Sequence, residues 1–464
     1  MAFPFPTMPG MKSRSTGMPL VLSVLIVFAL GAASLSAQDA KPVAPPDNKP
    51  IVKSIDLKDG DTLVFLGDSI THQCLYTQYI EDYFYTRYPT KRIRFHNSGV
   101  GGDRAADALR RFDEDVAAFK PRYVTILLGM NDGTYRDFDK ATFDTYQKDM
   151  ATVLDRIADV GAVAVPMTPT MHDARAARAG KRGPQEPRDT YYNGVLALYG
   201  AWLREQAHVR GLGFVDMYSL LNNLTTEARK TKPEFTLIKD AVHPDAPGQV
   251  VMACAILSDM ISRSMVSTIT STVGVNGKRT VAGTNGKATD LKDSDTLSFT
   301  FAANALPWVL PAEAAEGFKL TKAGHRYSNE RITIGSLKPG RYEVRIDGAP
   351  VGTFTDAQLA RGVELQENTK TPQYQQALAV AELNKEKNDK AMRPVRDQWR
   401  NLKVKRNELA KTPDDVTKKQ AFETWLPEFK ASVEKLNASV REYEAKIYAA
   451  NQPKPHRYEI APAK

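Results

Sequence analysis

Five short apolar runs, alternating with longer segments of helical periodicity, constrain the fold of this chain most strongly. In chain order between residues 62 and 262 the runs read TLVFL, RIRFH, YVTILL, AVAVPM and GFVDM. The segments between them repeat apolar residues every three or four positions, which is the spacing of an amphipathic helix. Two such stripes are Leu109, Phe112, Val116 and Phe119, and Phe143, Tyr146, Met150, Val153 and Ile157. Strands that are apolar throughout and alternate with helices predict a parallel sheet covered on both faces. We therefore expect a three-layer α/β/α sandwich with a five-stranded parallel sheet over residues 51–265.

The composition changes after Met265 to one rich in Gly, Thr and Asn. Alternating runs such as TLSFTF, RITIGSL and RYEVRIDG follow, with Asn-Gly pairs at Asn276 and Asn285. Asn-Gly between strand-like runs is a strong hairpin signal. Residues 268–356 are therefore predicted to form a small antiparallel β domain. Trp308, in NALPWVLP, could serve as a sugar-stacking platform, although an aromatic residue between prolines is more often buried.

Residues 357–464 are charged and helical in pattern. One apolar stripe carries Met392, Val395, Trp399 and Leu402, and the other carries Phe429, Val433, Leu436, Val440, Tyr443 and Ile447. TPDD at 412–415 separates them and resembles a helix start with Pro at the first helical position. The pattern predicts an antiparallel helical hairpin whose apolar seam packs on itself.

The N-terminus is typical of an export signal. Lys12 and Arg14 precede an apolar run over residues 20–30, and the small-residue stretch GAASLSA ends at Ala37. Because the run is too short to span a bilayer, residues 1–37 are predicted to be a cleaved signal peptide, with an uncleaved anchor as the alternative. Residues 38–50 are a Pro-rich linker. The mature chain is then expected in the periplasm or outside the cell, without a stable membrane span.

Charge and cysteine content exclude some classes of function. The formal charge of +9 falls to +7 without the two basic residues of the signal, and no basic block interleaved with aromatics indicates nucleic-acid binding. Cys74 and Cys254 are too few for a disulfide scaffold; they could form one bridge, or Cys254 could be a small core residue. The histidines lack a spacing such as HExxH, and there is no cysteine cluster, so we expect neither a metal nor a cofactor.

Three of the apolar runs are followed by loops with residues suited to acyl chemistry. Gly67-Asp68-Ser69 follows the first run, NSGVGGD at 97–103 the second, and GMND at 129–132 the third. Loops at the carboxyl ends of parallel strands meet at one edge, which brings Ser69, Gly102 and Asn131 together. A serine nucleophile needs hydrogen-bond donors for the oxyanion of its tetrahedral intermediate. A glycine backbone N–H and an asparagine amide are suitable donors.

A base for the serine is available near the end of the same segment. DAVHPDAPGQ places Asp240 three residues before His243, so that the carboxylate could hold the imidazole tautomer while the ring faces the serine. Each motif also has a simpler interpretation. Gly-Asp-Ser could be a turn with Ser69 as a helix cap, and Asp245 with Pro247 could be only a helix start.

Taken together, the four blocks resemble those of the SGNH hydrolases, also called GDSL esterases. GDSI at Gly67, NSGVGGD at Asn97, GMND at Gly129 and DAVHP at Asp240 occur in the family order, with isoleucine in place of leucine in the first block. The resemblance covers roughly residues 61–262. It implies a flavodoxin-like fold with Ser69 as nucleophile and Asp240 and His243 completing the triad. It also implies an oxyanion hole of the Ser69 and Gly102 backbone N–H groups and the Asn131 amide.

The expected function is a secreted serine esterase that removes O-acetyl groups from carbohydrate. A lipid esterase, lysophospholipase or thioesterase would use the same triad, and a non-enzymatic binding or scaffold protein is the remaining alternative. Candidate substrate-binding residues are His72, Arg104, Arg175 and Arg178. The last two belong to a basic loop with Lys181, Arg182 and Arg188, which could attract an anionic glycan or could be only a solvated insertion.

Overall fold

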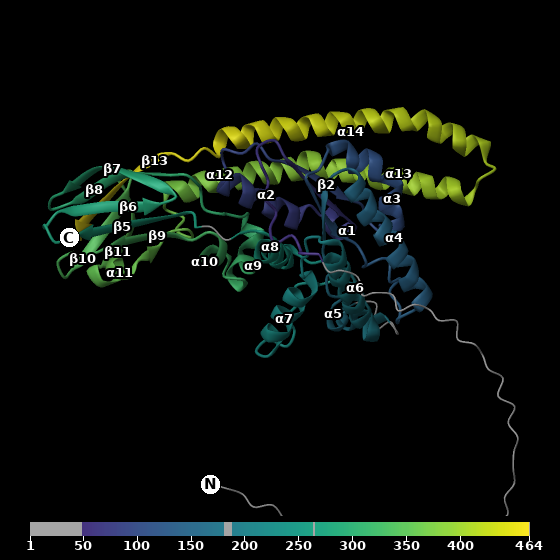
Figure 1. The fold of residues 1–464 in the computed structure, drawn as a ribbon, viewed down its shortest axis with the longest axis horizontal. Helices are drawn as coiled ribbons and strands as arrows, with labels where there is room; N and C mark the ends of the chain where they lie inside the picture. The colour runs from purple at the N-terminus through teal and green to yellow at the C-terminus, as the bar shows by residue number, and fades with distance from the viewer. Residues whose placement is uncertain (1–48, 181–187, 263–264, 464) are drawn as a thin grey trace, which may run out of the picture. The chain divides into compact units, whose positions relative to one another are not determined.

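The computed structural model describes residues 49–180, 188–262 and 265–463 (Figure 1). Four of the five apolar runs form one parallel sheet. The strands are β1 (Thr62–Gly67), β2 (Arg94–Gly99), β3 (Tyr123–Leu127) and β4 (Val163–Pro166), in the order β2-β1-β3-β4. The run GFVDM adds only a parallel bridge between Val215 and Met167 instead of a fifth strand. The extended stretch is short because Asp216 already caps the next helix, accepting a hydrogen bond from the Ser219 N–H at 2.9 Å.

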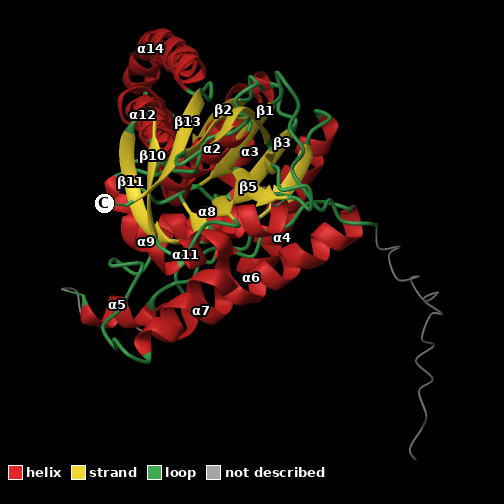
Figure 2. Cartoon of the chain, turned by 90° about the vertical axis from the view of Figure 1, so that its left-hand side faces the viewer, coloured by secondary structure: helices red, strands yellow, loops and turns green. Residues whose placement is uncertain are grey.

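Helices cover both faces of this sheet, as the α/β/α prediction requires (Figure 2). On one face α2 (Leu75–Arg87) packs against α8 (Ala246–Met260), and on the other lie α3 (Ala105–Asp115), α4 (Lys140–Asp159) and α6 (Arg188–Arg210). The predicted stripe of α4 is buried from Tyr146 to Ile157. Helix α7 (Met217–Arg229) lies against α8. The shorter helices of the sandwich are α1 (Ser69–His72), η1 (Ala117–Phe119) and α5 (Ala174–Ala179).

Residues 267–364 and a strand near the C-terminus form two further sheets. The first has the order β11-β10-β13-β8-β7 and is antiparallel, and the second has the order β12-β9-β5-β6. Apolar side chains of both sheets, among them Phe299 and Ile332, form one shared core. The strands are β5 (Ser267–Val273), β6 (Arg279–Thr284), β7 (Gly286–Asp293), β8 (Leu297–Ala303), β9 (Glu330–Ile334), β10 (Arg341–Ile346), β11 (Ala349–Thr355), β12 (Val363–Glu364) and β13 (Pro455–Pro462).

Two features of these sheets differ from the expected antiparallel domain. Strands β5 and β9 are parallel, because the connection before β9 contains η2 (Ala312–Ala314), α9 (Ala315–Leu320) and α10 (Ala323–Tyr327) and is long enough for a crossover. Strand β13 lies between β8 and β10, although its residues were predicted to belong to residues 357–464, the helical hairpin and the tail that follows it. Its alternating burial, with Tyr458 and Ile460 inward, is the strand signal.

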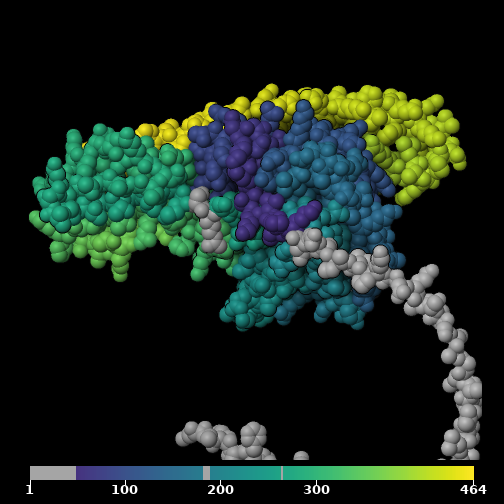
Figure 3. Space-filling model, viewed as in Figure 1, coloured from purple at the N-terminus to yellow at the C-terminus, as the bar shows by residue number. Residues whose placement is uncertain are grey.

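The predicted helical hairpin forms, and it lies along the surface of the α/β sandwich (Figure 3). One arm runs through α12 (Pro372–Lys387), a π-helical turn (Asn388–Met392, η3) and α13 (Arg393–Lys411), and the other is α14 (Val416–Ala450). Asp415, not Thr412, caps α14 by accepting from the Lys418 N–H at 3.0 Å. The short helix α11 (Asp356–Arg361) precedes the hairpin.

The apolar seam of the hairpin is shared with the sandwich and is not only self-packed. Met392, Trp399 and Phe429 cluster with Cys74 and Val100, which belong to the loops after β1 and β2. Buried ion pairs add to this attachment: Lys387 Nζ lies 3.0 Å from Glu81 Oε2, with both side chains 0% exposed. The described residues form one compact unit, and the hairpin is an integral part of it.

Other single-residue expectations can be compared directly with the structure. Cys74 and Cys254 are free and buried. Trp308 is 1% exposed, and its indole N–H donates to the Tyr79 carbonyl at 3.0 Å, so it belongs to the core and offers no stacking platform. In the described part of the chain, no helix combines the length and the apolarity that crossing a bilayer would need. Residues 1–37, where the signal peptide is predicted, lie outside the described residues.

Candidate active site

The turn after β1 exposes the Ser69 hydroxyl. Asp68 caps α1, because its Oδ1 accepts the Ile70 N–H at 2.9 Å. Ser69 is therefore the first helical residue and not the cap, so its hydroxyl is not used for capping. The helix approaches the sheet closely: a Cβ added at Gly99, the last residue of β2, would lie 2.3 Å from the His72 nitrogen.

A chain of hydrogen bonds links Ser69 to His243 and Asp240. His243 Nε2 lies 2.8 Å from Ser69 Oγ, and His243 Nδ1 lies 2.7 Å from Asp240 Oδ2. Since an ionised carboxylate only accepts, Nδ1 carries the proton and Nε2 is left to accept from the serine hydroxyl. The hydrogen bond to Asp240 raises the pKa of His243 above 6.5, against the opposing effect of partial burial. The imidazole is thus oriented and electrostatically supported as a base.

The loop that carries this pair is held by its own backbone. Asp240 Oδ1 accepts the N–H groups of Val242 at 3.0 Å and His243 at 2.7 Å. Partial burial opposes ionisation of Asp240, but the hydrogen bonds from His243 and from the backbone keep the pKa of its carboxyl below the ordinary value. Ala241 is buried with φ +74°, an unfavourable conformation for a non-glycine residue that its surroundings must maintain.

Two backbone N–H groups beside the serine are available as donors. Among the described residues, no hydrogen bond uses the N–H of Ser69 or of Gly102. The neighbouring Gly101 N–H donates instead to His72 Nδ1 at 3.3 Å. Gly102 has φ +74°, the left-handed region that glycine adopts without strain. The turn after β2 therefore presents the Gly102 N–H without a protein acceptor.

The Asn131 side chain has a defined orientation. Tyr135 donates its hydroxyl hydrogen to Asn131 Oδ1 at 3.1 Å, which turns Nδ2 the other way. Nδ2 lies 3.1 Å from the Asp103 carbonyl and 3.4 Å from Asp68 Oδ2. The amide nitrogen thus lies between the loops after β1 and β2. Tyr135 was not predicted, and no pattern in the sequence distinguishes it from the other tyrosines.

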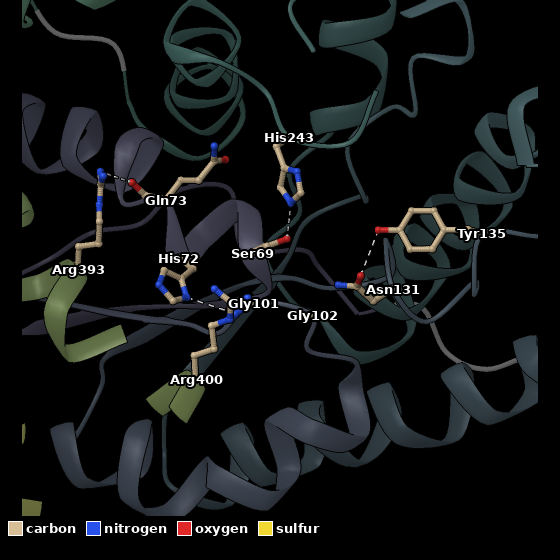
Figure 4. A pocket seen from close by; sticks show the side chains of 10 residues that line it. All are labelled: Ser69, His72, Gln73, Gly101, Gly102, Asn131, Tyr135, His243, Arg393 and Arg400. Carbon is tan, nitrogen blue, oxygen red and sulfur yellow. Dashed lines mark hydrogen bonds between the residues drawn. The ribbon is translucent and has the colours of Figure 1, made fainter. Parts of the chain in front are cut away.

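These groups line a pocket of about 540 Å³, within the usual range of small-molecule sites (Figure 4). Its lining consists of Ser69, His72, Gln73, Gly101, Gly102, Asn131, Tyr135, His243, Arg393 and Arg400. Arg393 and Arg400 come from α13, more than 300 residues after the serine. Sequence reasoning missed both, because charged residues on a helix ordinarily indicate only a solvated face.

Of the four candidate substrate-binding residues, only His72 lines the pocket. Its Nε2 lies 3.1 Å from Asp397 Oδ1, and burial lowers the pKa of His72 to about 4 despite that carboxylate. Arg104 is an exposed residue at the start of α3, and Arg175 and Arg178 are exposed on α5; none of the three lines the pocket. Lys181, Arg182 and the Arg188 side chain lie outside the described residues.

A buried charge network lies beneath the glycine loop and connects it to the hairpin. Arg111 contacts Asp103 at 2.8 Å and Asp115 at 2.6 Å, and it donates to the Gly67 carbonyl at 3.2 Å. Arg396 of α13 pairs with both oxygens of Asp115 at 2.7 and 2.9 Å, and Lys403 lies 2.9 Å from Asp103. The network thus fixes the loops after β1 and β2 against α13. Within residues 49–180, 188–262 and 265–463, no group of three or more His, Cys, Asp or Glu residues is arranged to hold a metal ion.

Comparisons with known proteins find similarity to ester hydrolases over part of the chain. Residues 65–251 match the GDSL-like lipase/acylhydrolase family. An acetylxylan esterase from Geobacillus stearothermophilus is 26% identical over 224 residues, which cover 43% of this chain and 94% of that protein.

A solved structure, of a gut microbial diltiazem-metabolizing enzyme, has a similar fold. It is 24% identical, with a TM-score of 0.76, and the match covers 89% of this chain and 99% of that one. Because the match extends over so much of both chains, the overall architecture described above is common to the two proteins.

Proposed function

We propose that this chain removes O-acetyl groups from a carbohydrate or polysaccharide. Residues 65–251 match the GDSL-like lipase/acylhydrolase family, and the chain is a carboxylic ester hydrolase. One observation carries the catalytic part of the proposal: Asp240, His243 and Ser69 form a continuous hydrogen-bond chain next to two backbone N–H groups that have no acceptor among the described residues. The similarity to an acetylxylan esterase supports the acetyl and carbohydrate part.

In the proposed acylation step, His243 Nε2 takes the hydroxyl proton as Ser69 Oγ attacks the ester carbonyl carbon. The carbonyl oxygen becomes an oxyanion, and the N–H groups of Ser69 and Gly102 and the Asn131 amide are the donors aimed at it. Asp240 keeps the imidazole oriented and stabilises the imidazolium. Collapse of the intermediate breaks the bond to the sugar oxygen, which takes the proton from His243 Nε2 and leaves as an alcohol.

In the second step, His243 acts on water in the same way. Nε2 takes a proton from the water as its oxygen attacks the acyl-serine carbonyl. The resulting intermediate collapses, Ser69 Oγ regains the proton, and acetic acid leaves. Both steps use one base and one set of donors, so the chain's own residues account for the complete cycle.

Replacing the serine tests the catalytic assignment. We expect Ser69→Ala to lower kcat for a chromogenic acetyl ester by about 10⁴-fold or more, because the nucleophile is lost. Ser219→Ala on α7, outside the pocket, is the matched control and should keep normal rates. Full activity of Ser69→Ala would refute the assignment, and so would failure of a serine-directed phosphonate to label Ser69.

The substrate class is tested by acetate release from a panel of acetylated polysaccharides and by esters of increasing acyl length. We expect activity to be highest with acetyl and to fall as the chain lengthens. A preference for long acyl chains would favour the lipid esterase or thioesterase alternative. The family assignment leaves little support for the non-enzymatic scaffold alternative.

We further propose that the chain is exported, as residues 1–37 predict. Expression of the full chain in a Gram-negative host, followed by fractionation and N-terminal sequencing, tests this. A mature N-terminus within a few residues of Ala37 in the periplasm or medium supports cleavage. A full-length chain in the membrane fraction would indicate the anchor alternative.

A further inference from the structure

The pocket around Ser69 has a cationic wall supplied by α13. Arg393 and Arg400 are the cations among its ten lining residues, and none of the ten is a carboxylate. In Figure 4 both arginines extend from α13 towards the turns that carry Gln73 and Gly101. A Cβ built on Gly101 would lie 3.6 Å from both Cδ and Nε of Arg400. The guanidinium therefore borders the loop that also presents the Gly102 N–H.

The two arginines differ in how their charge is compensated. Arg393 donates to the Gln73 carbonyl at 2.8 Å and lies 3.4 Å from Asp389 Oδ1, so it is held in place and partly neutralised. The Arg400 side chain is exposed and takes part in none of the ion pairs or side-chain hydrogen bonds among the described residues. Asp397, one turn earlier on the same helix, is directed instead at His72 Nε2 at 3.1 Å.

The other groups around the pocket supply no acceptor, among the described residues, to the Arg400 side chain or to Arg393 Nε. His72 Nδ1 already accepts the Gly101 N–H, and Tyr135 and Asn131 bond to each other. Arg393 Nε is buried and has no hydrogen-bond partner among the described residues. The buried Arg393 Nε calls for an acceptor from outside the protein, and the exposed Arg400 guanidinium on the same wall is available to bind one.

We propose that Arg400, supported by Arg393, binds a carboxylate of the substrate, so that the preferred substrate is an acetylated carbohydrate that also carries uronic acid groups. This rests on the proposed function and specifies its substrate class. The planar guanidinium presents parallel N–H donors that match a carboxylate in a bidentate fashion. Because Arg400 borders the glycine loop, the carboxylate is bound on the sugar that bears the scissile acetyl group or on its neighbour.

The basic residues of α5 are placed differently from Arg400. Arg175 and Arg178 are exposed and do not line the pocket. Charges outside the pocket raise the encounter rate, whereas Arg400, although it is also exposed, lines the pocket and is placed to contact the bound substrate.

The experiment compares one oligosaccharide in two charge states. Acetylated oligogalacturonide and its fully methyl-esterified form share the sugar and the acetyl group and differ in the carboxylate charge. Acetate release gives kcat/KM for each, measured for the full chain, for Arg400→Gln, for Arg400→Lys and for Arg441→Gln. Arg441 is 61% exposed on α14, pairs with Glu434 and lies outside this pocket, so it is the matched control.

We expect the unmodified chain to prefer the free-acid form by about tenfold or more, the size of one good charge-assisted contact. Arg400→Gln should bring the ratio near one, Arg400→Lys should keep part of it, and Arg441→Gln should keep all of it. Equal rates on both forms in the unmodified chain, or an unchanged ratio in Arg400→Gln, would overturn the carboxylate subsite. Acetate release from either form would still leave the proposed function standing. No acetate release from any acetylated carbohydrate, acidic or neutral, would instead refute both.

Discussion

Replacing Arg396 with methionine tests whether the buried network attaches the helical hairpin to the α/β sandwich. Arg396 is 0% exposed and makes two hydrogen bonds to Asp115, at 2.7 and 2.9 Å. Charge-assisted hydrogen bonds contribute about 1.5–3 kcal/mol each, so the two together set an upper range of about 3–6 kcal/mol.

The surroundings place the expected loss at the lower end of that range. Asp115 keeps Arg111 at 2.6 Å, His96 at 3.0 Å and Ser98 at 2.9 Å after the substitution, so its charge is not left unpaired. Arg396 Nε is itself buried without a hydrogen-bond partner among the described residues, a cost that methionine removes. We therefore expect Arg396→Met to destabilise the docked hairpin by about 3 kcal/mol.

Native-state hydrogen exchange of the α13 amides measures this directly, without assuming two-state unfolding of a long chain. A loss of about 3 kcal/mol should make opening about 100-fold more frequent. Arg441→Met is the control, because an exposed pair contributes about 0–1 kcal/mol. Exchange within about threefold of the unmodified chain would refute the view that this ion pair holds the hairpin in place.

Two further predictions concern the catalytic groups. The hydrogen bond to Asp240 raises the pKa of His243 above 6.5, and catalysis requires the neutral imidazole. We therefore expect kcat/KM for an acetyl ester to fall on acidification with a midpoint above pH 6.5. A midpoint at or below pH 6.5 would contradict the hydrogen-bonded geometry. Asn131→Ala should lower kcat by about 10²–10³-fold, the usual effect of losing one oxyanion donor. Tyr135→Phe keeps the Asn131 amide but removes the hydrogen bond that orients it. We therefore expect a smaller loss, about tenfold, mainly in kcat. Equal losses in the two variants would mean that Tyr135 does more than orient the amide.

The sheet and the loops around Ser69 could be predicted because their signals are local. Apolar runs and helical stripes define the layers, and parallel strands bring their carboxyl ends to one edge. Ser69, Gly102, Asn131 and His243 meet there for that reason. The prediction of a fifth strand was wrong because it did not take account of Asp216. That residue caps α7 and so ends the extended stretch after Val215. A run that is apolar on both faces indicates a buried strand, but it does not show at which residue the extended backbone ends.

The contribution of the C-terminal region could not be predicted, because its contacts depend on burial that composition does not reveal. Lys387 and Arg396 are fully buried, yet on a charged helix they look like solvated residues. Strand β13 follows a 35-residue helix, and its partners β8 and β10 are more than 100 residues away in sequence. Such pairings leave a weak period-two alternation as their only local signal.

These contacts make the hairpin part of the hydrolytic unit and not an accessory attached to it. Without α12 and α13, Glu81 would lose Lys387, and Asp115 would lose Arg396, so each carboxylate would lose a cation that now compensates its charge. Helix α13 also places Lys403 against Asp103 beside the glycine loop and Arg400 against Gly101. The packing of the hairpin against the sandwich therefore completes the core and forms a wall of the pocket. As a result, the positive charge of the pocket comes from residues that lie more than 300 positions after Ser69 in the sequence.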